Sequence, residues 1–304
     1  MIVVLGSINI DLFFTLDRLP ARGETVLAPT MATRPGGKGA NQAAAAARAG
    51  TAAAFLGCVG DDSSADTVLA ALAATGCDVS RVRRVSGPTG TAIVMVETGG
   101  ENQIVVASGA NLSAAADLLD DGPLGPEATL VCQMEIPPAQ TAAALRRAGA
   151  AGARTVLNMA PARWIAPAAL ADVDVLVVNE IEAAALEGGG GTPLQIARAL
   201  AGRHRLTCVV TLGGQGALAV AADGATWSVG ALPVEPVDTV GAGDAFVGVL
   251  AASLDDGAPL PEALHRASVA AGLACTKEGA MPSLPDAAAI ETHLGDLAPA
   301  RHLD

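Results

Sequence analysis

The sequence predicts an α/β fold in which a mostly parallel sheet is covered by helices on both faces, with a second, smaller sheet beside it. Short apolar segments rich in Val and Ile alternate along the chain with longer alanine-rich segments, as in strand–helix–strand units. The apolar segments show no in–out alternation, which is typical of strands that are buried on both faces. Two further segments lack a helical pattern and supply the smaller sheet.

The elements of the larger sheet follow from these patterns. The expected core strands are residues 2–5, 53–58, 129–132, 155–157, 173–178 and 207–212. The expected helices, two of which stop at Gly50 and Gly76, are residues 40–49, 64–74, 139–148, 193–201, 242–254 and 260–276.

Residues 10–34 and 89–108 form the smaller sheet in this prediction, because both segments alternate between apolar and polar residues. Gly99-Gly100 separates two such runs and predicts a hairpin turn.

The composition is that of a folded, acidic protein with an alanine- and valine-filled interior. The 304 residues are 51% hydrophobic and 16% charged, with four Phe, two Trp and no Tyr. The net charge of −13 is spread along the chain, and no basic stripe suggests a nucleic-acid partner. The five cysteines form no CxxC pair, which favours reduced thiols. Neither a leader peptide nor an apolar run of membrane length is visible, so we expect a cytoplasmic protein without a membrane partner.

The turn Gly241-Ala242-Gly243-Asp244 carries the strongest chemical signal. Two glycines lead into an apolar helical pattern, so backbone amides and the helix dipole can bind an anion there. A carboxylate beside such an anion site fits a general base that activates an attacking hydroxyl. A first-turn acid that only complements the helix dipole is the alternative for Asp244.

A second glycine-rich segment, Pro35-Gly36-Gly37-Lys38-Gly39-Ala40-Asn41-Gln42, begins a helix. It does not match the GxxxxGK[ST] phosphate loop, and no GxGxxG follows the first strand, which disfavours a dinucleotide-binding domain. Two interpretations of this segment remain: its glycines let the backbone approach a polar ligand closely, or the segment simply begins a helix. Asn41 can donate to and accept from hydroxyl groups.

Polar residues follow several expected strands, where ligands of open α/β sheets bind. Asn9 and Asp11 alternate onto one side, and turn formation is their alternative role. Asn179 and Glu182 have the spacing of a helix capping box and can also serve Mg²⁺ and phosphate. The segment from Thr211 to Gly216 can cradle a nucleotide or form a hairpin. The histidines and cysteines lack zinc-ligand spacing.

Taken together, these motifs resemble the ribokinase family of carbohydrate kinases, from Val3 to about Pro285. The signatures are Gly36-Gly37-Lys38-Gly39-Ala40-Asn41-Gln42 and Asp238-Thr239-Val240-Gly241-Ala242-Gly243-Asp244, supported by Ser108-Gly109-Ala110-Asn111 and Ala160-Pro161-Ala162-Arg163. Met159 and Met281 depart from the family pattern, which usually has proline and glutamine there.

The resemblance implies a Rossmann-like, three-layer α/β/α core within a single kinase domain, residues 1–304, whose segments 10–34 and 89–108 form a lid. The lids often pair across a homodimer in this family. The positions that match the family's sugar site are Asn9, Asp11, Gly37, Lys38, Gly39, Asn41, Glu135 and Asp244. Those that match its nucleotide site are Asn179, Thr211, Gly213, Gly216, Gly243 and Ser268. Glu182 would organise Mg²⁺, and a monovalent cation, usually K⁺, would lie at Asp238, Val240, Ala274, Lys277, Gly279 and Ser283.

The activity implied by the resemblance is ATP-dependent phosphorylation of D-ribose at its 5-hydroxyl, giving D-ribose 5-phosphate and ADP. Asp244 would be the general base, with an anion hole formed by the turn Gly241-Ala242-Gly243-Asp244. Another sugar, such as deoxyribose or fructose, is an alternative substrate. So is a nucleoside, whose base Phe13 or Phe14 would contact, whereas Asp11, Asn41 and Glu135 favour a free sugar. A non-catalytic sensor on the same fold is the third possibility.

Overall fold

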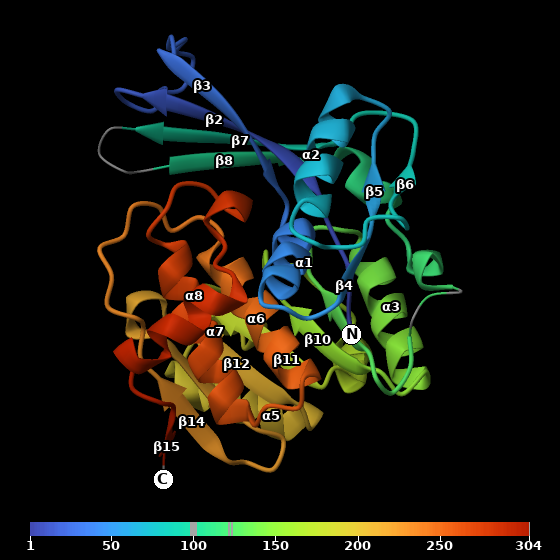
Figure 1. Cartoon of the computed structure of the whole chain (residues 1–304), viewed down its shortest axis with the longest axis vertical. Helices are drawn as coiled ribbons and strands as arrows, with labels where there is room; N and C mark the ends of the chain where they lie inside the picture. Colours follow the sequence, from blue (N-terminus) through green and yellow to red (C-terminus); the bar gives the residue numbers. More distant parts are fainter. Residues whose placement is uncertain (98–101, 121, 123, 304) are drawn as a thin grey trace.

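The computed structural model describes residues 1–97, 102–120, 122 and 124–303, and its larger sheet has nine strands. Their order is β15-β14-β13-β12-β11-β10-β9-β1-β4 (Figure 1). The bounds are β1 (Ile2–Leu5), β4 (Ala53–Leu56), β9 (Thr129–Cys132), β10 (Arg154–Asn158), β11 (Val175–Asn179), β12 (Thr207–Thr211), β13 (Ala217–Val220), β14 (Thr226–Val229) and β15 (Arg301–Leu303). All pairs from β4 to β12 are parallel, and β13, β14 and β15 continue the sheet antiparallel.

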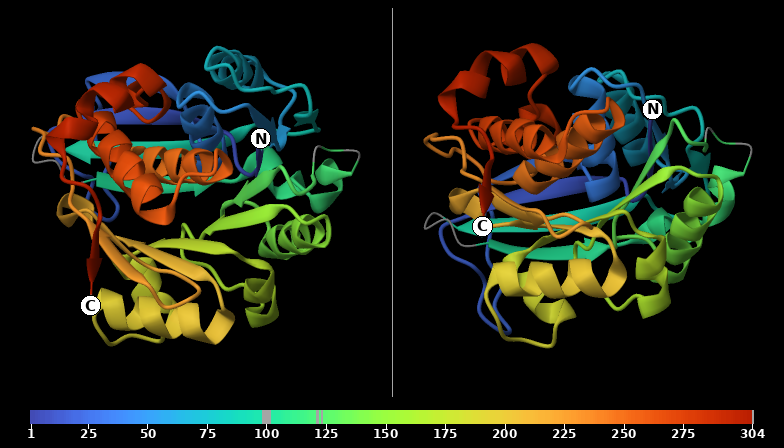
Figure 2. Two further views of the ribbon diagram at one scale, coloured as in Figure 1. Left: turned by 60° about the horizontal axis from the view of Figure 1, so that its bottom comes forward. Right: turned by 90° about the horizontal axis from the view of Figure 1, so that it is seen from below.

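Helices cover both faces of this sheet, as expected from the unalternating strands (Figure 2). On one side lie α1 (Lys38–Arg48), α2 (Ser63–Ala73), α6 (Ala242–Asp255), α7 (Leu260–Ala274) and α8 (Ala287–His293). On the other lie α3 (Pro138–Ala150), α4 (Glu180–Leu186) and α5 (Pro193–His204). Successive strand residues enter opposite cores: Ile2 and Val4 pack in the first, Val3 and Leu5 in the second. The predicted three-layer α/β fold is confirmed.

The smaller sheet has four strands in the order β3-β2-β7-β8. Their bounds are β2 (Asn9–Leu16), β3 (Thr30–Gly36), β7 (Gly90–Glu97) and β8 (Asn102–Ala107). Only Gly6, Ser7 and Ile8 separate β1 from β2, so this sheet lies at the carboxyl end of the core strands (Figure 1). Asn9 and Asp11 therefore belong to a strand of the smaller sheet. The predicted turn Gly99-Gly100 lies outside the described residues, although β7 and β8 do pair antiparallel.

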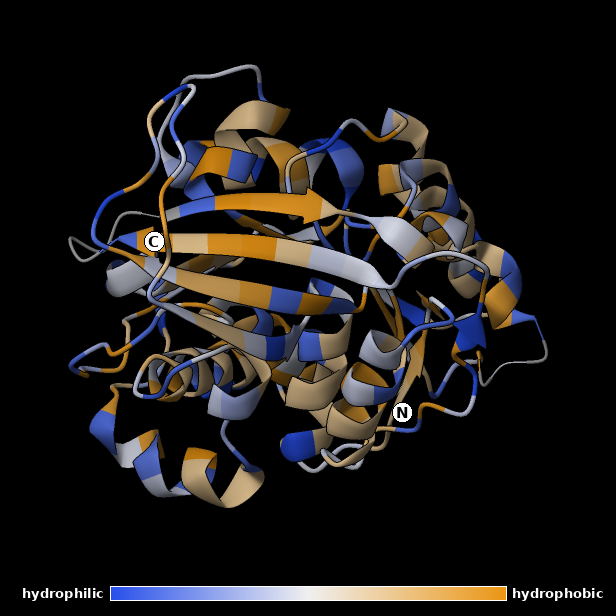
Figure 3. Cartoon of the chain, turned by 90° about the horizontal axis from the view of Figure 1, so that it is seen from above, coloured by the Kyte–Doolittle hydropathy of each residue, from blue (hydrophilic) through white to orange (hydrophobic). Residues whose placement is uncertain are grey.

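Strand register divides the smaller sheet into two faces. Asp11 pairs with Arg34 of β3 and Ala92 of β7, so Asp11, Phe13 and Arg34 share the face toward the core. The smaller sheet lies over the rest of the molecule (Figure 3), and by register the residues on its opposite face are largely apolar. The members of this face include Leu12, Phe14, Met31, Ile93 and Val105. Met31 is 58% exposed and Val105 59% exposed.

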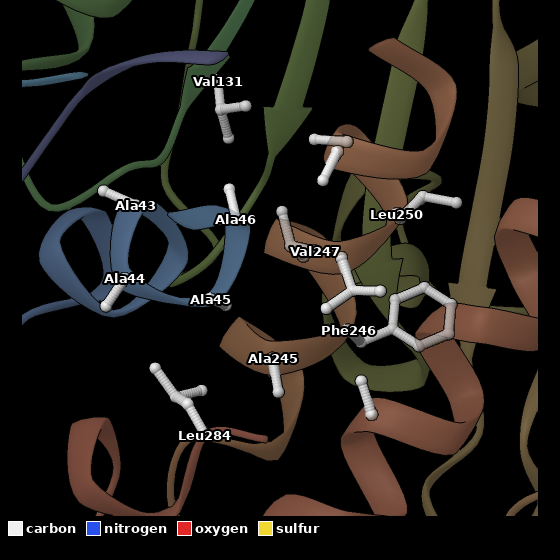
Figure 4. Packing of buried hydrophobic residues seen from close by; sticks show 14 of the residues in the cluster. Ala43, Ala44, Ala45, Ala46, Val131, Ala245, Phe246, Val247, Leu250 and Leu284 are labelled. Carbon is white, nitrogen blue, oxygen red and sulfur yellow. The ribbon is translucent and has the colours of Figure 1, made fainter. Parts of the chain in front are cut away.

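Small residues pack α1 against α6 (Figure 4). Ala43, Ala44, Ala45 and Ala46 of α1 are all buried in the same core as α6. A methyl group added to Gly248 of α6 would come within 2.5 Å of the Gln42 carbonyl oxygen and 2.6 Å of Ala45 Cβ. The prediction that alanine and valine fill most of the interior is confirmed by the many buried residues of these two types. The contact between α1 and α6 positions the site described below.

The remaining elements are short. Strands β5 (Cys58–Val59) and β6 (Arg83–Arg84) form a parallel pair, and several single 3₁₀ turns connect the larger elements. Helix α8 and strand β15 have no counterpart in the sequence prediction, and the predicted helix 260–276 ends two residues earlier, at Ala274. In the part of the chain that the structure describes, every helix is too short or too polar to traverse a bilayer.

Candidate active site

The predicted anion-binding turn forms the start of α6. Gly241 is the N-cap, with a left-handed φ of 82°, and a Cβ there would lie 2.7 Å from the Ala280 Cα. Both the backbone conformation and the space therefore require glycine. The Ala242 N–H donates to the Thr239 carbonyl at 3.3 Å. The amides of Gly243 and Asp244 follow in the first helical turn, where no earlier helical carbonyl is available as acceptor.

Asp244 is buried, and both of its carboxylate oxygens accept amide hydrogen bonds from α1. Asn41 Nδ2 donates to Oδ2 and Gln42 Nε2 donates to Oδ1, each at 2.9 Å. Burial raises the pKa of Asp244 and Glu135 raises it further, whereas Lys38, Asn41 and Gln42 lower it. A carboxylate has about four lone-pair directions, so the two bonds leave Asp244 able to accept another proton.

Asp11 and Asn41 each present a buried oxygen that has no hydrogen-bond partner among the residues that the structure describes. The two atoms are Asp11 Oδ1 and Asn41 Oδ1. Gly36 makes room for Asp11, since a Cβ at Gly36 would lie 2.0 Å from Asp11 Oδ2. Burial, together with Glu135 and Asp244, raises the pKa of Asp11 to about 7. Buried acceptors are rarely left unsatisfied, so these two atoms are free to accept hydrogen bonds from a bound molecule.

Asn9 and Glu135, also predicted to bind sugar, are held by neighbours from other elements. Asn111 Nδ2 donates to Asn9 Oδ1 at 2.7 Å. Glu135 Oε2 accepts from Ser7 Oγ at 2.6 Å and from the Lys38 backbone N–H at 3.0 Å. Glu135 therefore accepts a hydrogen bond from the backbone at the start of α1, in addition to any contact with a ligand.

The glycines beside Lys38 permit close packing. A Cβ on Gly37 would lie 2.8 Å from the Asn9 backbone nitrogen, and one on Gly39 would lie 2.6 Å from the Ser7 backbone nitrogen. These contacts give Gly37 and Gly39 a steric role against the end of β1. Burial would lower the pKa of Lys38, but Asp244, Glu135 and Glu182 together raise it. Lys38 therefore remains a cation among three acids.

Asn179 and Glu182 form the capping box of α4. The Glu182 N–H donates to Asn179 Oδ1 at 2.8 Å, and the Asn179 N–H donates to Glu182 Oε2 at 2.9 Å. The same residues line a cavity of about 230 Å³ together with Lys38, Thr211 and Asp244. Burial raises the pKa of Glu182. Asn179 and Glu182 therefore do cap α4. Because they line the same cavity as Asp244, a contact with phosphate is compatible with that role.

A second, more apolar cavity adjoins the first. It measures about 470 Å³, and Val234, Phe246 and Ala271 contribute to its walls. Five of the predicted nucleotide-binding residues line it: Thr211, Gly213, Gly216, Gly243 and Ser268. Thr211, Thr239 and Gly243 line both cavities, so the two lie side by side. The Ser268 hydroxyl donates to the Gly230 carbonyl at 2.5 Å.

Asp238 connects the segment before α6 with the segment after α7. Its Oδ1 accepts from the Val240 N–H at 3.0 Å and its Oδ2 from the Gly279 N–H at 2.8 Å. The predicted cation positions Ala274, Lys277, Gly279 and Ser283 all lie on or next to this second segment, where Ser283 Oγ donates to the Ala280 carbonyl. Within the described ranges, no three His, Cys, Asp or Glu residues gather as a metal site.

The sequence prediction missed Gln42, Gln133, Asn158 and Asn111 as members of the site. The sequence pattern marks Gln42 only as part of a glycine-rich helix start. Gln133 and Asn158 stand at the carboxyl ends of β9 and β10, the signal that identified Asn9 and Asp11, and it would have found them too. A separate cavity of about 930 Å³ lies at the opposite ends of the strands and is lined by residues such as Arg154, Asp174 and Asp255.

This geometry defines a class of enzyme: an α/β phosphotransferase with a carboxylate at a helix start, between a polar pocket and an apolar cleft.

The sequence model of the pfkB family carbohydrate kinases matches residues 1–287 of this chain. The ribokinase of Schizosaccharomyces pombe is 35% identical over 300 residues, covering 93% of this chain and 94% of that protein. Two ribokinase structures superpose over nearly the whole chain. That of Thermotoga maritima has a TM-score of 0.90 and 32% identity, covering 97% of this chain and 99% of the other. That of Arabidopsis thaliana, complexed with ribose and ATP, has a TM-score of 0.87 and 32% identity, covering 96% and 98%.

The chain belongs to the pfkB family of carbohydrate kinases. The prediction of an enzyme of this family, made from two glycine-containing signatures, is confirmed.

Proposed function

We propose that this protein uses ATP to phosphorylate D-ribose at its 5-hydroxyl, producing D-ribose 5-phosphate and ADP. The observation that carries the proposal is the pair of unpartnered buried acceptors, Asp11 Oδ1 and Asn41 Oδ1, beside the carboxylate of Asp244. Hydroxyl groups of a sugar would satisfy both atoms and place a further hydroxyl at the base. The similar ribokinases, one of them complexed with ribose and ATP, support the choice of substrates.

In this proposal the sugar occupies the space between the smaller sheet and α1, and the nucleotide occupies the apolar cleft. The primary hydroxyl lies between Asp244 and the terminal phosphate of ATP. Asp244 accepts the proton as the hydroxyl oxygen bonds to phosphorus and the bond from phosphorus to the ADP oxygen breaks. The amides of Gly243 and Asp244, with the dipole of α6, stabilise the negative charge of the transferring group. The smaller sheet acts as a lid that excludes water.

The proposed metal partners are Mg²⁺ and K⁺. Mg²⁺ usually binds through one or two carboxylates plus phosphate oxygens and water, where it neutralises phosphate charge. The buried carboxylate of Glu182, inside the cavity shared with Lys38 and Asp244, fits such a site. For K⁺, the proposed donors are oxygens at Asp238, Val240, Ala274, Lys277, Gly279 and Ser283, a set that suits a hard cation. Ribose kinetics with and without added K⁺ test the second assignment, with activation expected.

A free sugar is favoured over a nucleoside by the surroundings of Phe13. Its ring faces the core, but the Arg34 guanidinium lies 4.7 Å from the ring centroid and covers it. A nucleobase would have to displace that contact. ADP release measured with ribose, deoxyribose, fructose and adenosine distinguishes the candidates, and we expect the highest kcat/KM for ribose. Preference for adenosine would exclude the free-sugar assignment, and sugar binding without ADP release would indicate a sensor.

Replacing Asp244 with Asn tests the chemical step. The amide keeps the shape of the side chain but cannot accept the proton, so we expect turnover to fall by roughly 10²–10⁴-fold. ATP affinity, measured by calorimetry, should change little because the nucleotide cavity is lined by other residues. Near-normal turnover in this variant would show that another group is the base.

We further propose that the protein is a homodimer and is located in the cytoplasm. A homodimer formed through the smaller sheet is supported by the apolar residues on its outer face. A cytoplasmic location is supported by the five free cysteines, four of them buried in the cores.

A further inference from the structure

A chain of buried amide side chains reaches Asp244 through Gln42, and its member Asn158 also lines the cavity that contains Lys38 and Glu182. Gln42 and Gln133 are both fully buried. Gln133 Nε2 donates to Gln42 Oε1 at 2.7 Å, and Gln42 Nε2 donates to Asp244 Oδ1 at 2.9 Å. Gln42 Nε2 also donates to Asn158 Oδ1 at 3.0 Å. Side chains from α1, from β10 and from the residue after β9 therefore meet at the Gln42 amide, which alone of the three reaches Asp244.

The direction of every bond in this chain is determined. Asn158 Nδ2 donates to the Val177 carbonyl at 3.1 Å, so the Asn158 oxygen must face Gln42. Gln42 consequently presents its nitrogen to two acceptors, Asn158 Oδ1 and Asp244 Oδ1. If the Gln42 amide were reversed, its oxygen would face both acceptors and its nitrogen would face the Gln133 nitrogen. A main-chain carbonyl of β11 thus sets the orientation of the donor that reaches Asp244.

Glycine makes room for the outer end of the chain. A Cβ on Gly6 would lie 2.0 Å from Gln133 Oε1, so only the absence of a side chain lets the Gln133 amide lie against the end of β1. The Gln133 position is therefore built into the fold.

We propose that Gln42 is a positioning residue, which Gln133 and Asn158 orient and which holds Asp244 with its free lone pairs toward the sugar hydroxyl. The inference rests on the proposed role of Asp244 as the base and assigns it a support from α1 through the Gln42 amide. A carboxylate held at both oxygens cannot rotate about its last bond without losing a charge-assisted hydrogen bond.

The chain also acts on the charge of Asp244. The charged groups that interact with this carboxylate are Lys38 from α1, Asp11 from β2, Glu135 after β9 and Glu182 from α4. Burial raises the pKa of Asp244, and the Gln42 donor lowers it because it stabilises the ionised form. Losing that donor should leave less of the base ionised near neutral pH.

The test compares Gln42→Met, Gln42→Glu and Gln133→Met by pH profiles of kcat and kcat/KM for ribose. For Gln42→Met we expect the acid limb of kcat/KM to move up by about one pH unit. We also expect kcat to fall about tenfold, while KM for ribose changes by less than about threefold. Gln42→Glu adds a negative charge beside Asp244 and should move the acid limb of kcat/KM to still higher pH. Gln133→Met should move it less, in the same direction.

The control is Gln140→Met, the same change in α3, which removes one bond to the Ala116 N–H and should leave the profile unchanged. An unshifted acid limb in both Gln42 variants, with lower kcat or lower thermal stability, would reduce Gln42 to a structural role and overturn the proposal. If Gln42→Met does not fold, the isosteric Gln42→Glu and the outer Gln133→Met decide the question. Asp244→Asn separates the two hypotheses, because an active Asp244→Asn enzyme with the original acid limb contradicts the base assignment itself.

Discussion

At Asp11, a carboxyl group that we assign to sugar binding is buried beside Glu135 and Asp244, and its pKa rises from 3.8 to about 7. Between these pH values the folded protein retains a proton that the unfolded chain has released. Stability therefore decreases as the pH rises through this interval, and the loss is complete above pH 7. Asp11→Asn should raise the free energy of unfolding, by roughly 2 kcal/mol more at pH 8 than at pH 5.

The same substitution should lower kcat/KM for ribose by at least about tenfold, because a neutral amide is a weaker acceptor than a carboxylate. Thermal unfolding at both pH values, together with steady-state kinetics, measures the two effects. Asp61→Asn, at an exposed position, serves as the control. A stability gain that does not depend on pH would mean that Asp11 is not protonated in the folded enzyme.

Single residues of the site could be predicted from sequence only where a local pattern marks them. Asp244 follows two glycines at a helix start, and Asn9 and Asp11 follow a strand. Gln42 carries no such mark, although it stands next to Asn41. Both Asn41 and Gln42 donate to Asp244 because of the way α1 crosses α6, and the residues that meet there are about 200 positions apart in sequence.

Among the elements, β3 of the smaller sheet contacts the segment after α7 through Arg34. The guanidinium donates to Glu278 Oε2 at 2.7 Å and lies 3.8 Å from Asp238 Oδ2. This is a direct link between the proposed lid and the segment that holds the proposed cation site. Because Glu278 is 70% exposed, the ion pair is worth at most about 1 kcal/mol.

Arg34→Ala and Glu278→Ala should each raise KM for ribose, by no more than about fivefold, and should increase ATP hydrolysis in the absence of sugar. A double-mutant cycle measures the coupling between them. Arg84→Ala, which removes a comparable surface pair with Asp66, should have no effect. If the effects of Arg34→Ala and Glu278→Ala are strictly additive in the double mutant, the contact between these two residues does not hold the lid.

Elements with a large buried surface were predictable, and those that depend on a neighbour were not. The six parallel strands carry unbroken apolar runs because helices cover both faces. Strand β15 is only Arg301, His302 and Leu303, and it exists because β14 offers a free edge. Helix α8 buries a single large residue, Ile290, which leaves almost no periodic signal.

For the whole molecule, the apolar outer face of the smaller sheet predicts its oligomeric state. Ile93, which is 39% exposed, lies on this face with Val105 beside it on β8. We expect a dimer by sedimentation, and Ile93→Lys should shift it toward monomer because a buried charge would be unpaired. Ile181→Lys makes the same change at a site that is 80% exposed on α4, and the dimer should persist. A wild-type monomer at micromolar concentration would exclude the assignment.

The close approach of α1 and α6 has a consequence for how this enzyme can vary. Gly248 and Ala45 act as a fixed spacer, and the width of that spacer sets the reach of Gln42 and Asn41 toward Asp244. Enlarging either side chain to improve thermal tolerance would separate the two helices and lengthen those bonds. Position 248 therefore has to stay glycine over sequence drift or directed evolution, because a smaller residue at position 45 would leave the Gln42 carbonyl in place.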